Sequence, residues 1–299
     1  MAKILVAGLI NTETTVQIER FPVEYTPVRY AFNQISSSVS GVGFNIAKAL
    51  SILGNDVHLH SLIGDDLSSQ AIRTELDKLG INHDKVLTIL ESSPQSVILY
   101  DDDGKRMINT DLKTIQNTDY PLEKLALDRV DIAILANINF SRAMLQPIKD
   151  AHIPIATDIH TISNIDHEYN QDYMAMADIL FMSHEGLPTS PENWIHQLWE
   201  RFGTAYIGIG MGAEGAIIAI RDSQQIIRVP TYSLRPVINT VGAGDALFSS
   251  FVHSLINDKD PLLAMQKAVL FASYKVGATG GSTGFMTSEQ LSATHQQYF

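Results

Sequence analysis

Short apolar segments separated by helical stretches recur through the second half of the chain, and this alternation restricts the possible folds more than any other feature. The expected strands cover residues 131–136, 153–158, 178–182, 204–209 and 215–220. Helical stretches lie between most of them, and one begins at Ser190-Pro191 with Trp194 and Leu198 on one face. Short buried strands that alternate with helices are typical of a mainly parallel sheet. The sequence therefore predicts an α/β protein.

Two stretches do not follow this alternation. Residues 11–34 mix Thr, Val, Gln and Tyr with two prolines and show no helical period. Residues 94–113 have the pattern of a hairpin with Asp103-Gly104 in its turn. We interpret the two stretches as insertions that form one small sheet. The expected domains are a large α/β domain of residues 1–10, 34–93 and 115–299, and a small β lid of residues 11–33 and 94–114.

Composition excludes several classes of protein. The 299 residues contain no cysteine, so disulfides, thiolate metal sites and thiol nucleophiles are impossible. There are 21 Lys+Arg against 33 Asp+Glu, a formal net charge of −12, which disfavours binding to nucleic acid. The apolar run Ile4–Ile10 is too short for a signal peptide core or a membrane span. We expect an acidic, cytoplasmic protein without nucleic-acid or membrane partners.

The segment Gly242-Ala243-Gly244 directly precedes a run with helical spacing. Its apolar positions are Leu247, Phe248, Phe251, Val252, Leu255 and Ile256. The helix is expected to start at about Ala243, which leaves the amide groups of the segment unpaired. Such amides, together with the positive end of the helix dipole, form an anion site.

Asp245 would project from the first turn of this helix, beside the bound anion. A carboxylate next to a phosphate can accept the proton of a hydroxyl that attacks the phosphate. The arrangement is thus consistent with phosphoryl transfer. The residues alone leave a second interpretation open, in which Asp245 only stabilises the helix N-terminus.

The same segment carries a family resemblance. Asn239-Thr240-Val241-Gly242-Ala243-Gly244-Asp245 resembles the Asp-Thr-x-Gly-Ala-Gly-Asp signature of the ribokinase-like, or PfkB, family of carbohydrate and nucleoside kinases. Ser40-Gly41-Val42-Gly43-Phe44-Asn45-Ile46-Ala47 is similar to the family's Gly-Gly-x-x-x-Asn-x-Ala element, and Ile63-Gly64-Asp65-Asp66 follows where the family has Gly-x-Asp. The resemblance implies a three-layer α/β/α ribokinase-like fold with a mainly parallel central sheet and a small β-sheet lid. It also implies an ATP- and Mg²⁺-dependent kinase that phosphorylates a hydroxyl of a sugar or sugar-like molecule.

The resemblance also implies roles for individual residues. Asp245 would be the catalytic base, and the amides of Gly242, Ala243 and Gly244 would form the anion hole. The expected acceptor-binding residues are Asn11, Glu13, Gly41, Gly43, Asn45 and Asp245. The expected nucleotide-binding residues are Gly210, Gly212, Gly215, Ser183, Gly244 and Ser273. Glu185 is the candidate for Mg²⁺ through water, and Asn239 for a monovalent cation.

Several positions depart from the family pattern. Glu13 stands where Asp is usual, and Ser183-His184-Glu185-Gly186 replaces Asn-x-x-Glu. Asn239 replaces the first Asp of the signature and removes a negative charge near the expected cation position. Val42 stands where many ribose and sugar-phosphate kinases carry Lys, which argues against a phosphorylated sugar as acceptor.

Some alternatives remain open at this stage. Tyr30, Phe32 and Phe44 could stack on a base, as in a nucleoside kinase, although packing is the commoner role of such aromatic residues. A non-catalytic regulator that binds sugar or nucleotide is a second alternative. Arg106 could contact a phosphate or lie in solvent. Asp158, at the end of an expected strand, could reach the acceptor or cap a loop. An exposed lid edge could also pair with a second subunit to form a homodimer.

One motif points to a different class of enzyme. Gly210, Gly212 and Gly215 match the dinucleotide-binding fingerprint in their spacing. The fingerprint requires a helix directly after the glycines, whereas Ala216–Ile220 has the pattern of a strand. The sequence therefore disfavours a dinucleotide-dependent oxidoreductase.

Overall fold

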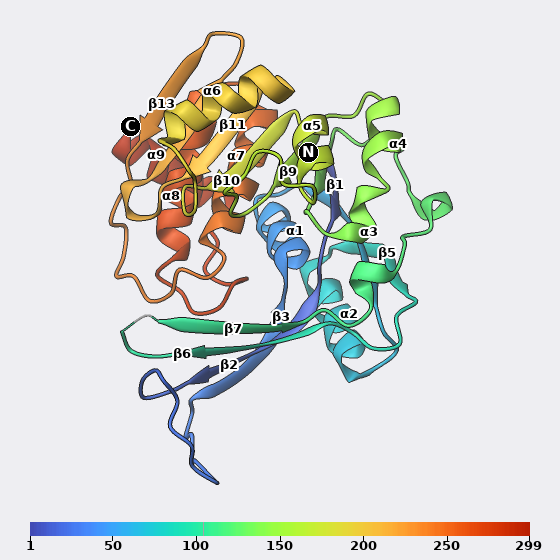
Figure 1. Cartoon of the computed structure of the whole chain (residues 1–299), viewed down its shortest axis with the longest axis vertical. Coiled ribbons are helices and arrows are strands. Elements are labelled where there is room, and N and C mark those ends of the chain that lie inside the picture. Colours follow the sequence, from blue (N-terminus) through green and yellow to red (C-terminus); the bar gives the residue numbers. More distant parts are fainter. Residues whose placement is uncertain (104) are drawn as a thin grey trace.

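The computed structural model describes residues 1–103 and 105–299, which form two β-sheets and the helices packed around the larger one (Figure 1). In spatial order, the nine strands of the large sheet are β13 (Gln225–Val229), β12 (Ala216–Ile220), β11 (Tyr206–Gly210), β10 (Ile179–Ser183), β9 (Ile155–Asp158), β8 (Ile132–Leu135), β1 (Lys3–Ala7), β4 (Asp56–Ile63) and β5 (Asn82–Thr88). The small sheet has the order β3 (Ile35–Ser40), β2 (Asn11–Gln17), β6 (Gln95–Tyr100) and β7 (Arg106–Asp111).

The large sheet is mainly parallel, as the sequence predicts. Only the pairs β11–β12 and β12–β13 are antiparallel. Strand β1 lies between β4 and β8, so the chain builds the sheet in one direction from β1 and then in the other. Ligand sites of α/β sheets collect at the carboxyl edge beside such a reversal. The topology thus indicates where a site should lie.

The helices cover both faces of the large sheet. The longer ones are α1 (Val42–Ile52), α2 (Leu67–Leu79), α6 (Pro191–Phe202), α7 (Ala243–Asp258), α8 (Pro261–Lys275) and α9 (Ser288–Tyr298), and the shorter ones are α3 (Asn139–Arg142), α4 (Leu145–Asp150) and α5 (Gln171–Met176). Apolar residues of α1, α2, α7 and α8 pack on one face of the sheet, and those of α3 to α6 pack on the other. The predicted three-layer fold is confirmed.

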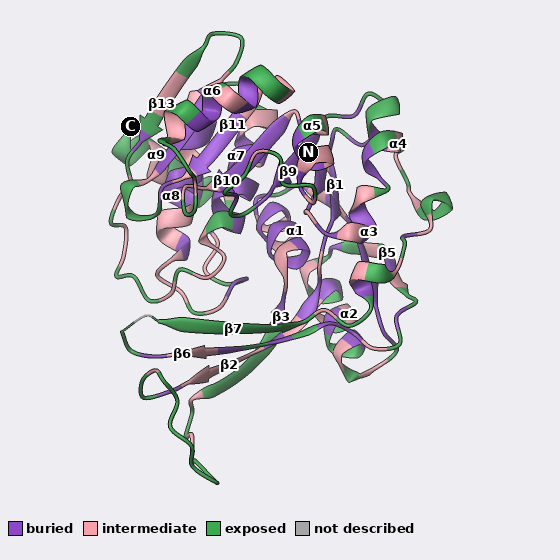
Figure 2. Ribbon diagram, in the orientation of Figure 1, coloured by how far each residue is buried: buried purple, intermediate pink, exposed green. Residues whose placement is uncertain are grey.

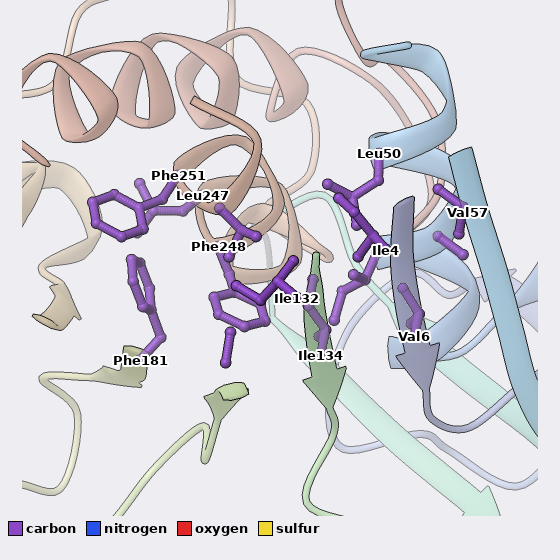
Figure 3. Packing of buried hydrophobic residues seen from close by; sticks show 14 of the residues in the cluster. Ile4, Val6, Leu50, Val57, Ile132, Ile134, Phe181, Leu247, Phe248 and Phe251 are labelled. Atoms are coloured by element: carbon purple, nitrogen blue, oxygen red, sulfur yellow. The ribbon is translucent and has the colours of Figure 1, made fainter. Parts of the chain in front are cut away.

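The period-two geometry of strands explains this two-sided core. In β1, Ile4 and Val6 pack with α1 and α7, while Leu5 packs with the opposite helices, because successive side chains point to opposite faces. Figure 2 shows the buried residues concentrated on these strands. On the α7 side, the Phe181 ring lies 5.1 Å from Phe248 and 5.0 Å from Phe251 between centroids (Figure 3). These contacts fix α7, and hence the glycine segment at its start, to the sheet.

The small sheet corrects one predicted boundary. Strand β3 pairs antiparallel with β2, from Asn11 opposite Ser40 to Val16 opposite Ile35, although the sequence prediction placed it in the large domain. Residues 18–34, all within the described chain, contain neither helix nor strand, so this part of the predicted lid is a loop. Strands β6 and β7 pair antiparallel as predicted, while Gly104 of the predicted turn lies outside the described residues. That the small sheet acts as a lid remains a prediction.

None of the helices in the described part of the chain is long and apolar enough to span a bilayer.

Candidate active site

A cavity of about 770 Å³ lies at the carboxyl edge of the large sheet, where the small sheet faces it. The ends of β9, β10 and β11 contribute Asp158, Ser183 and Gly210 to its wall. The small sheet contributes residues of β2, β6 and β7, among them Glu13 and Arg106. The cavity therefore occupies the position that the strand order indicates.

The glycine segment forms one wall of this cavity at the start of α7. The helix begins at Ala243, as predicted, with Gly242 as its N-cap at φ +77°. A Cβ on Gly242 would overlap the carbonyl oxygen of Gly281, so only glycine fits there. The Ala243 amide donates to the Thr240 carbonyl at 3.2 Å, whereas the described residues offer no partner to the amides of Gly242 and Gly244. Two of the three predicted amides are thus free to bind an anion.

Asp245 lies in the first turn of α7 and is 9% exposed. One of its oxygens, Oδ2, accepts a hydrogen bond from Asn45 Nδ2 at 2.8 Å. Burial raises the pKa of Asp245, and the charge of Asp158 raises it further, while the Asn45 bond and the charges of His160 and Lys275 lower it. The carboxylate is therefore positioned by Asn45 and sits close to both acidic and basic groups.

Glu13 and Asn11 from β2, both predicted to bind the acceptor, line the cavity on the side of the small sheet. Ser40 Oγ donates to Glu13 Oε2 at 3.2 Å, and Asn11 Nδ2 donates to Ser96 Oγ at 3.1 Å. In the described chain, Glu13 Oε1 and Asn11 Oδ1 are buried without a hydrogen-bond partner. Because unpaired buried oxygens are costly, these two are suited to accept hydrogen bonds from a ligand.

The two glycines predicted for the acceptor side lie in different surroundings. Gly41 lines the cavity and is the N-cap of α1 at φ +103°. Gly43 does not line it: a Cβ there would lie 2.5 Å from the carbonyl carbon of Gly8, so it is a packing glycine between α1 and β1. The predicted contact between Gly43 and the acceptor is therefore not supported.

All the residues predicted to bind the nucleotide line the same cavity: Ser183, Gly210, Gly212, Gly215, Gly244 and Ser273. The Met211 amide donates to the Gly215 carbonyl at 2.8 Å and closes a turn between β11 and β12. In this described segment a strand follows Gly215, as the sequence predicts, and not the helix that a dinucleotide-binding fingerprint requires.

The two predicted metal-binding residues differ in position. Glu185 is exposed at the cavity wall, and the described residues contain no cluster of three or more acidic or histidine side chains able to hold a metal ion. A single carboxylate suits Mg²⁺ that arrives on nucleotide phosphates, since this ion keeps waters and few protein ligands. Asn239 is not part of the wall, and its Oδ1 accepts the Val241 amide at 2.7 Å.

Three further polar residues line the cavity: Ser40, which the sequence did not assign, and Arg106 and Asp158, whose roles the sequence left open. Ser40 Oγ donates to Glu13 and lies 3.5 Å from Asn45 Oδ1. Its position in the N-terminal signature is the sequence signal that could have identified it as a site residue. Arg106 Nη1 donates to Thr240 Oγ1 at 3.3 Å, which joins β7 to the glycine segment. Asp158 both caps a loop, by accepting the His160 amide at 2.8 Å, and lines the cavity.

Comparison with known proteins identifies the family. The family model described as pfkB family carbohydrate kinase matches residues 1–288. An ATP-dependent ribose-1-phosphate kinase of Halopiger xanaduensis is 24% identical over 299 residues, which cover 95% of this chain and 94% of that protein. A pseudouridine kinase of Escherichia coli is 26% identical over 240 residues, 72% of each chain. The solved structure of a microbiome-derived acarbose kinase has a TM-score of 0.90 at 21% identity and covers 99% of both chains.

The family match spans both sheets and all the residues that line the cavity, and both of these curated relatives are named as kinases. The chain belongs to the pfkB family of carbohydrate kinases.

Proposed function

We propose that this chain transfers the γ-phosphoryl group of ATP to a hydroxyl of a sugar or sugar-like small molecule, with Asp245 as general base. The observation that carries the proposal is the position of the Asp245 carboxylate, one residue after the free amide of Gly244 and hydrogen-bonded to Asn45. A base and an anion site that share one helix turn can serve the two ends of the same phosphoryl transfer.

In the proposed reaction, the acceptor hydroxyl gives its proton to Asp245 and its oxygen attacks the γ-phosphorus. The bond between this phosphorus and the β-γ bridging oxygen breaks, and ADP leaves with that electron pair. Amides of Gly242 and Gly244 would stabilise the charge on the transferred group. Asp245 then releases the proton to solvent.

Mg²⁺, when bound, would neutralise charge on the phosphates, and Glu185, which lines the cavity, would hold the ion through water. On the protein side, Arg106 reaches from β7 to Thr240, two residues before Gly242. Its guanidinium is therefore available for a phosphate oxygen at the anion site. Closure of the small sheet over the cavity would exclude water and limit wasteful hydrolysis of ATP.

Acceptor chemistry is supported by the unpaired oxygens of Glu13 and Asn11, which match the donor hydroxyls of a sugar. The aromatic residues considered for a base are not at the cavity. Tyr30 and Phe32 stack on each other in the exposed loop 18–34, and Phe44 is fully buried. These positions give no support for base stacking by the three residues that the sequence suggested.

A nucleoside acceptor remains the second candidate, because relatives of this chain include a pseudouridine kinase. The test is a screen for ADP release with pentoses, hexoses, sugar acids, sugar phosphates and nucleosides, followed by ³¹P NMR of the product. Turnover of a free sugar supports the proposal, and turnover confined to nucleosides selects the second candidate. Binding of nucleotide or sugar without ADP release from any acceptor would instead indicate a regulator.

Pairing of two subunits through the small sheet belongs to the same proposal. Strand β7 forms one edge of that sheet, and all six of its residues are exposed. Exposed edge strands are templates for pairing with another chain. Light scattering on the purified protein would show a dimer, and a monomer at all concentrations would contradict this part.

A further inference from the structure

Lys275 is a buried cation without an assigned role. It is the last residue of α8, and its side chain is 0% exposed. Lysine is rarely buried, because removal of an ammonium group from water is costly unless partners replace the water. Its partners therefore indicate what the residue does.

The partners of Lys275 all belong to the active site or to the loop behind it. Its Nζ donates to the Gly280 carbonyl at 2.6 Å. Burial lowers the pKa of Lys275 to about 8. The charges of Asp245 and Glu13 oppose this lowering, and the charge of Arg235 adds to it. In return, Lys275 lowers the pKa of both carboxyl groups. The ammonium is thus one positive charge that acts on both the proposed base and the proposed acceptor ligand.

The loop that Lys275 holds, residues 276–284, supports the anion site from behind. The Gly281 carbonyl lies directly against Gly242, where a Cβ would overlap it. A Cβ on Gly281 itself would lie 3.0 Å from Asn45 Nδ2, the group that donates to Asp245. The loop therefore contacts both the free-amide segment and the residue that orients the carboxylate.

Further contacts attach the loop at its two ends. The amides of Ile238 and Asn239 donate to the Val276 carbonyl at 2.8 and 3.0 Å, and Ser282 Oγ donates to the Val39 carbonyl at 3.2 Å. Between these attachments, the bond from Lys275 to Gly280 fixes the middle of the loop. A displacement of the loop would change the positions of Gly242 and Asn45 together.

The family resemblance implies a monovalent cation near Asn239, whose amide donates to Val276 at the start of this loop, and the residues present do not fit one. Where the family signature has an Asp, this chain has Asn239, and its Oδ1 already accepts the Val241 amide. The Gly280 carbonyl accepts a hydrogen bond from the Lys275 ammonium. The Arg235 guanidinium lies over the Tyr274 ring and donates to the Gly284 carbonyl at 3.5 Å. Two fixed positive charges and no free carboxylate among these described groups disfavour a further cation.

We propose that the Lys275 ammonium is a built-in cation, which positions the loop 276–284 against the anion site, so that this kinase needs no added monovalent cation. The effect of this loop on turnover rests on the proposed function, whereas its attachment by Lys275 does not.

The first test uses the unaltered chain and does not depend on activity. Hydrogen exchange of the amides in 276–284 is compared in potassium chloride and in tetramethylammonium chloride of equal concentration. We expect exchange rates within about twofold of each other, because no potassium site orders the loop. Slowing of this exchange by potassium of about tenfold or more would overturn the proposal.

The second test removes the charge with Lys275→Met and uses Lys267→Met, on the same helix and paired with Asp258, as the matched control. We expect loop exchange at least about tenfold faster, kcat at least about tenfold lower and KM for ATP nearly unchanged. The acid limb of the kcat/KM profile should move to higher pH, since Asp245 loses a charge that lowers its pKa. Loss of structure alone would not move this limb.

An unchanged kcat and an unchanged acid limb in Lys275→Met would contradict the positioning role. If the variant does not fold, the potassium comparison on the unaltered chain still decides the cation claim. If the unaltered chain phosphorylates no acceptor, the proposed function fails, and the exchange data test the loop contact separately.

Discussion

The side-chain amide of Asn45 donates a hydrogen bond to the Asp245 carboxylate at 2.8 Å, across 200 positions of sequence. The bond joins the start of α1 to the start of α7, the two helices that carry the family signatures. It occupies Oδ2 and holds the carboxylate in one orientation, so Oδ1 is the oxygen left to accept a proton. It also opposes the rise in the pKa of Asp245 that burial causes.

Gly242→Ala is expected to damage the anion site. Gly242 has φ +77°, and a Cβ there would overlap the Gly281 carbonyl oxygen, so both strain and a steric clash result. The matched control is Gly80→Ala, which has φ +63° and nothing within 4 Å of the new Cβ. We expect the control to lose about 1 kcal/mol of unfolding free energy and keep its kcat. Gly242→Ala should lose more stability and most of its kcat in the same assays, and equal behaviour of the two variants would be evidence against the tight contact.

Glu13→Gln is expected to weaken acceptor binding. Glu13 Oε1 is buried without a partner in the described chain, and loss of its charge weakens the hydrogen bond that it would accept from an acceptor hydroxyl. We expect the KM of the acceptor to rise about 10- to 100-fold, which is the value of a hydrogen bond to a charged group. The KM of ATP should stay constant, and the exposed Glu19→Gln serves as the control. A larger effect on ATP than on the acceptor would place Glu13 on the wrong side of the cavity.

Arg106→Gln tests the contribution of the small sheet. The Arg106 guanidinium bonds Thr240 beside the anion site, while neighbouring Lys105 is exposed and does not line the cavity. We expect a decrease in kcat/KM of about tenfold or more for Arg106→Gln and no change for Lys105→Gln. Equal kinetics of the two variants would show that Arg106 only ends a solvated strand.

His60 is expected to make the fold sensitive to acid. It is 0% exposed on β4, its Nε2 has no partner among the described groups, and burial together with the charges of Lys85 and His58 lowers its pKa to about 4. An unfolded histidine binds its proton near pH 6.5, so the unfolded state holds more protons than the folded state between these values. Stability must therefore fall as the pH falls through this window.

The contribution of His60 amounts to about 2 kcal/mol between about pH 7 and pH 5. This contribution is measured by urea unfolding of the unaltered chain and of His60→Gln at both pH values. Only the unaltered chain should lose the part of its unfolding free energy that protonation of His60 causes. An equal loss of stability in both proteins would show that His60 is protonated in the folded state.

Elements with local signals were predictable from the sequence. Helix α6 begins after Ser190, whose hydroxyl accepts the Asn193 amide at 3.3 Å, and ends at Gly203 in the left-handed region. Helix α7 begins at Ala243 because Gly242 can adopt φ +77°. In both cases, one or two residues define the boundary without help from the rest of the chain.

The strands that were not predicted lack such signals. Strand β3 reads Ile-Ser-Ser-Ser-Val-Ser and has four exposed residues, and it is a strand because it pairs with β2. Strand β5 is an edge strand with mostly polar residues, and β13 is an edge strand of five residues whose two adjacent isoleucines are only partly buried. Their conformation depends on a neighbour that is distant or unknown at the level of sequence.

The site shows the same division. Asn45 and Asp245 each lie in a recognisable motif, but only the fold brings them into contact. Lys275 lies in no recognisable motif. A lysine at the C-terminal end of a helix is normally exposed to solvent, where its charge interacts favourably with the helix dipole. Its burial, with Nζ bonded to the Gly280 carbonyl, follows from the packing of α8 and its following loop, which local sequence does not specify.

The most direct test of the proposed mechanism is the turnover of Asp245→Asn, measured as ADP release with the acceptor found in the screen. The variant keeps the shape of the side chain but removes the proton acceptor. We expect kcat at least about a hundredfold lower, with the affinity for a non-hydrolysable ATP analogue largely unchanged. Turnover close to that of the unaltered chain would contradict the role of Asp245 as the general base.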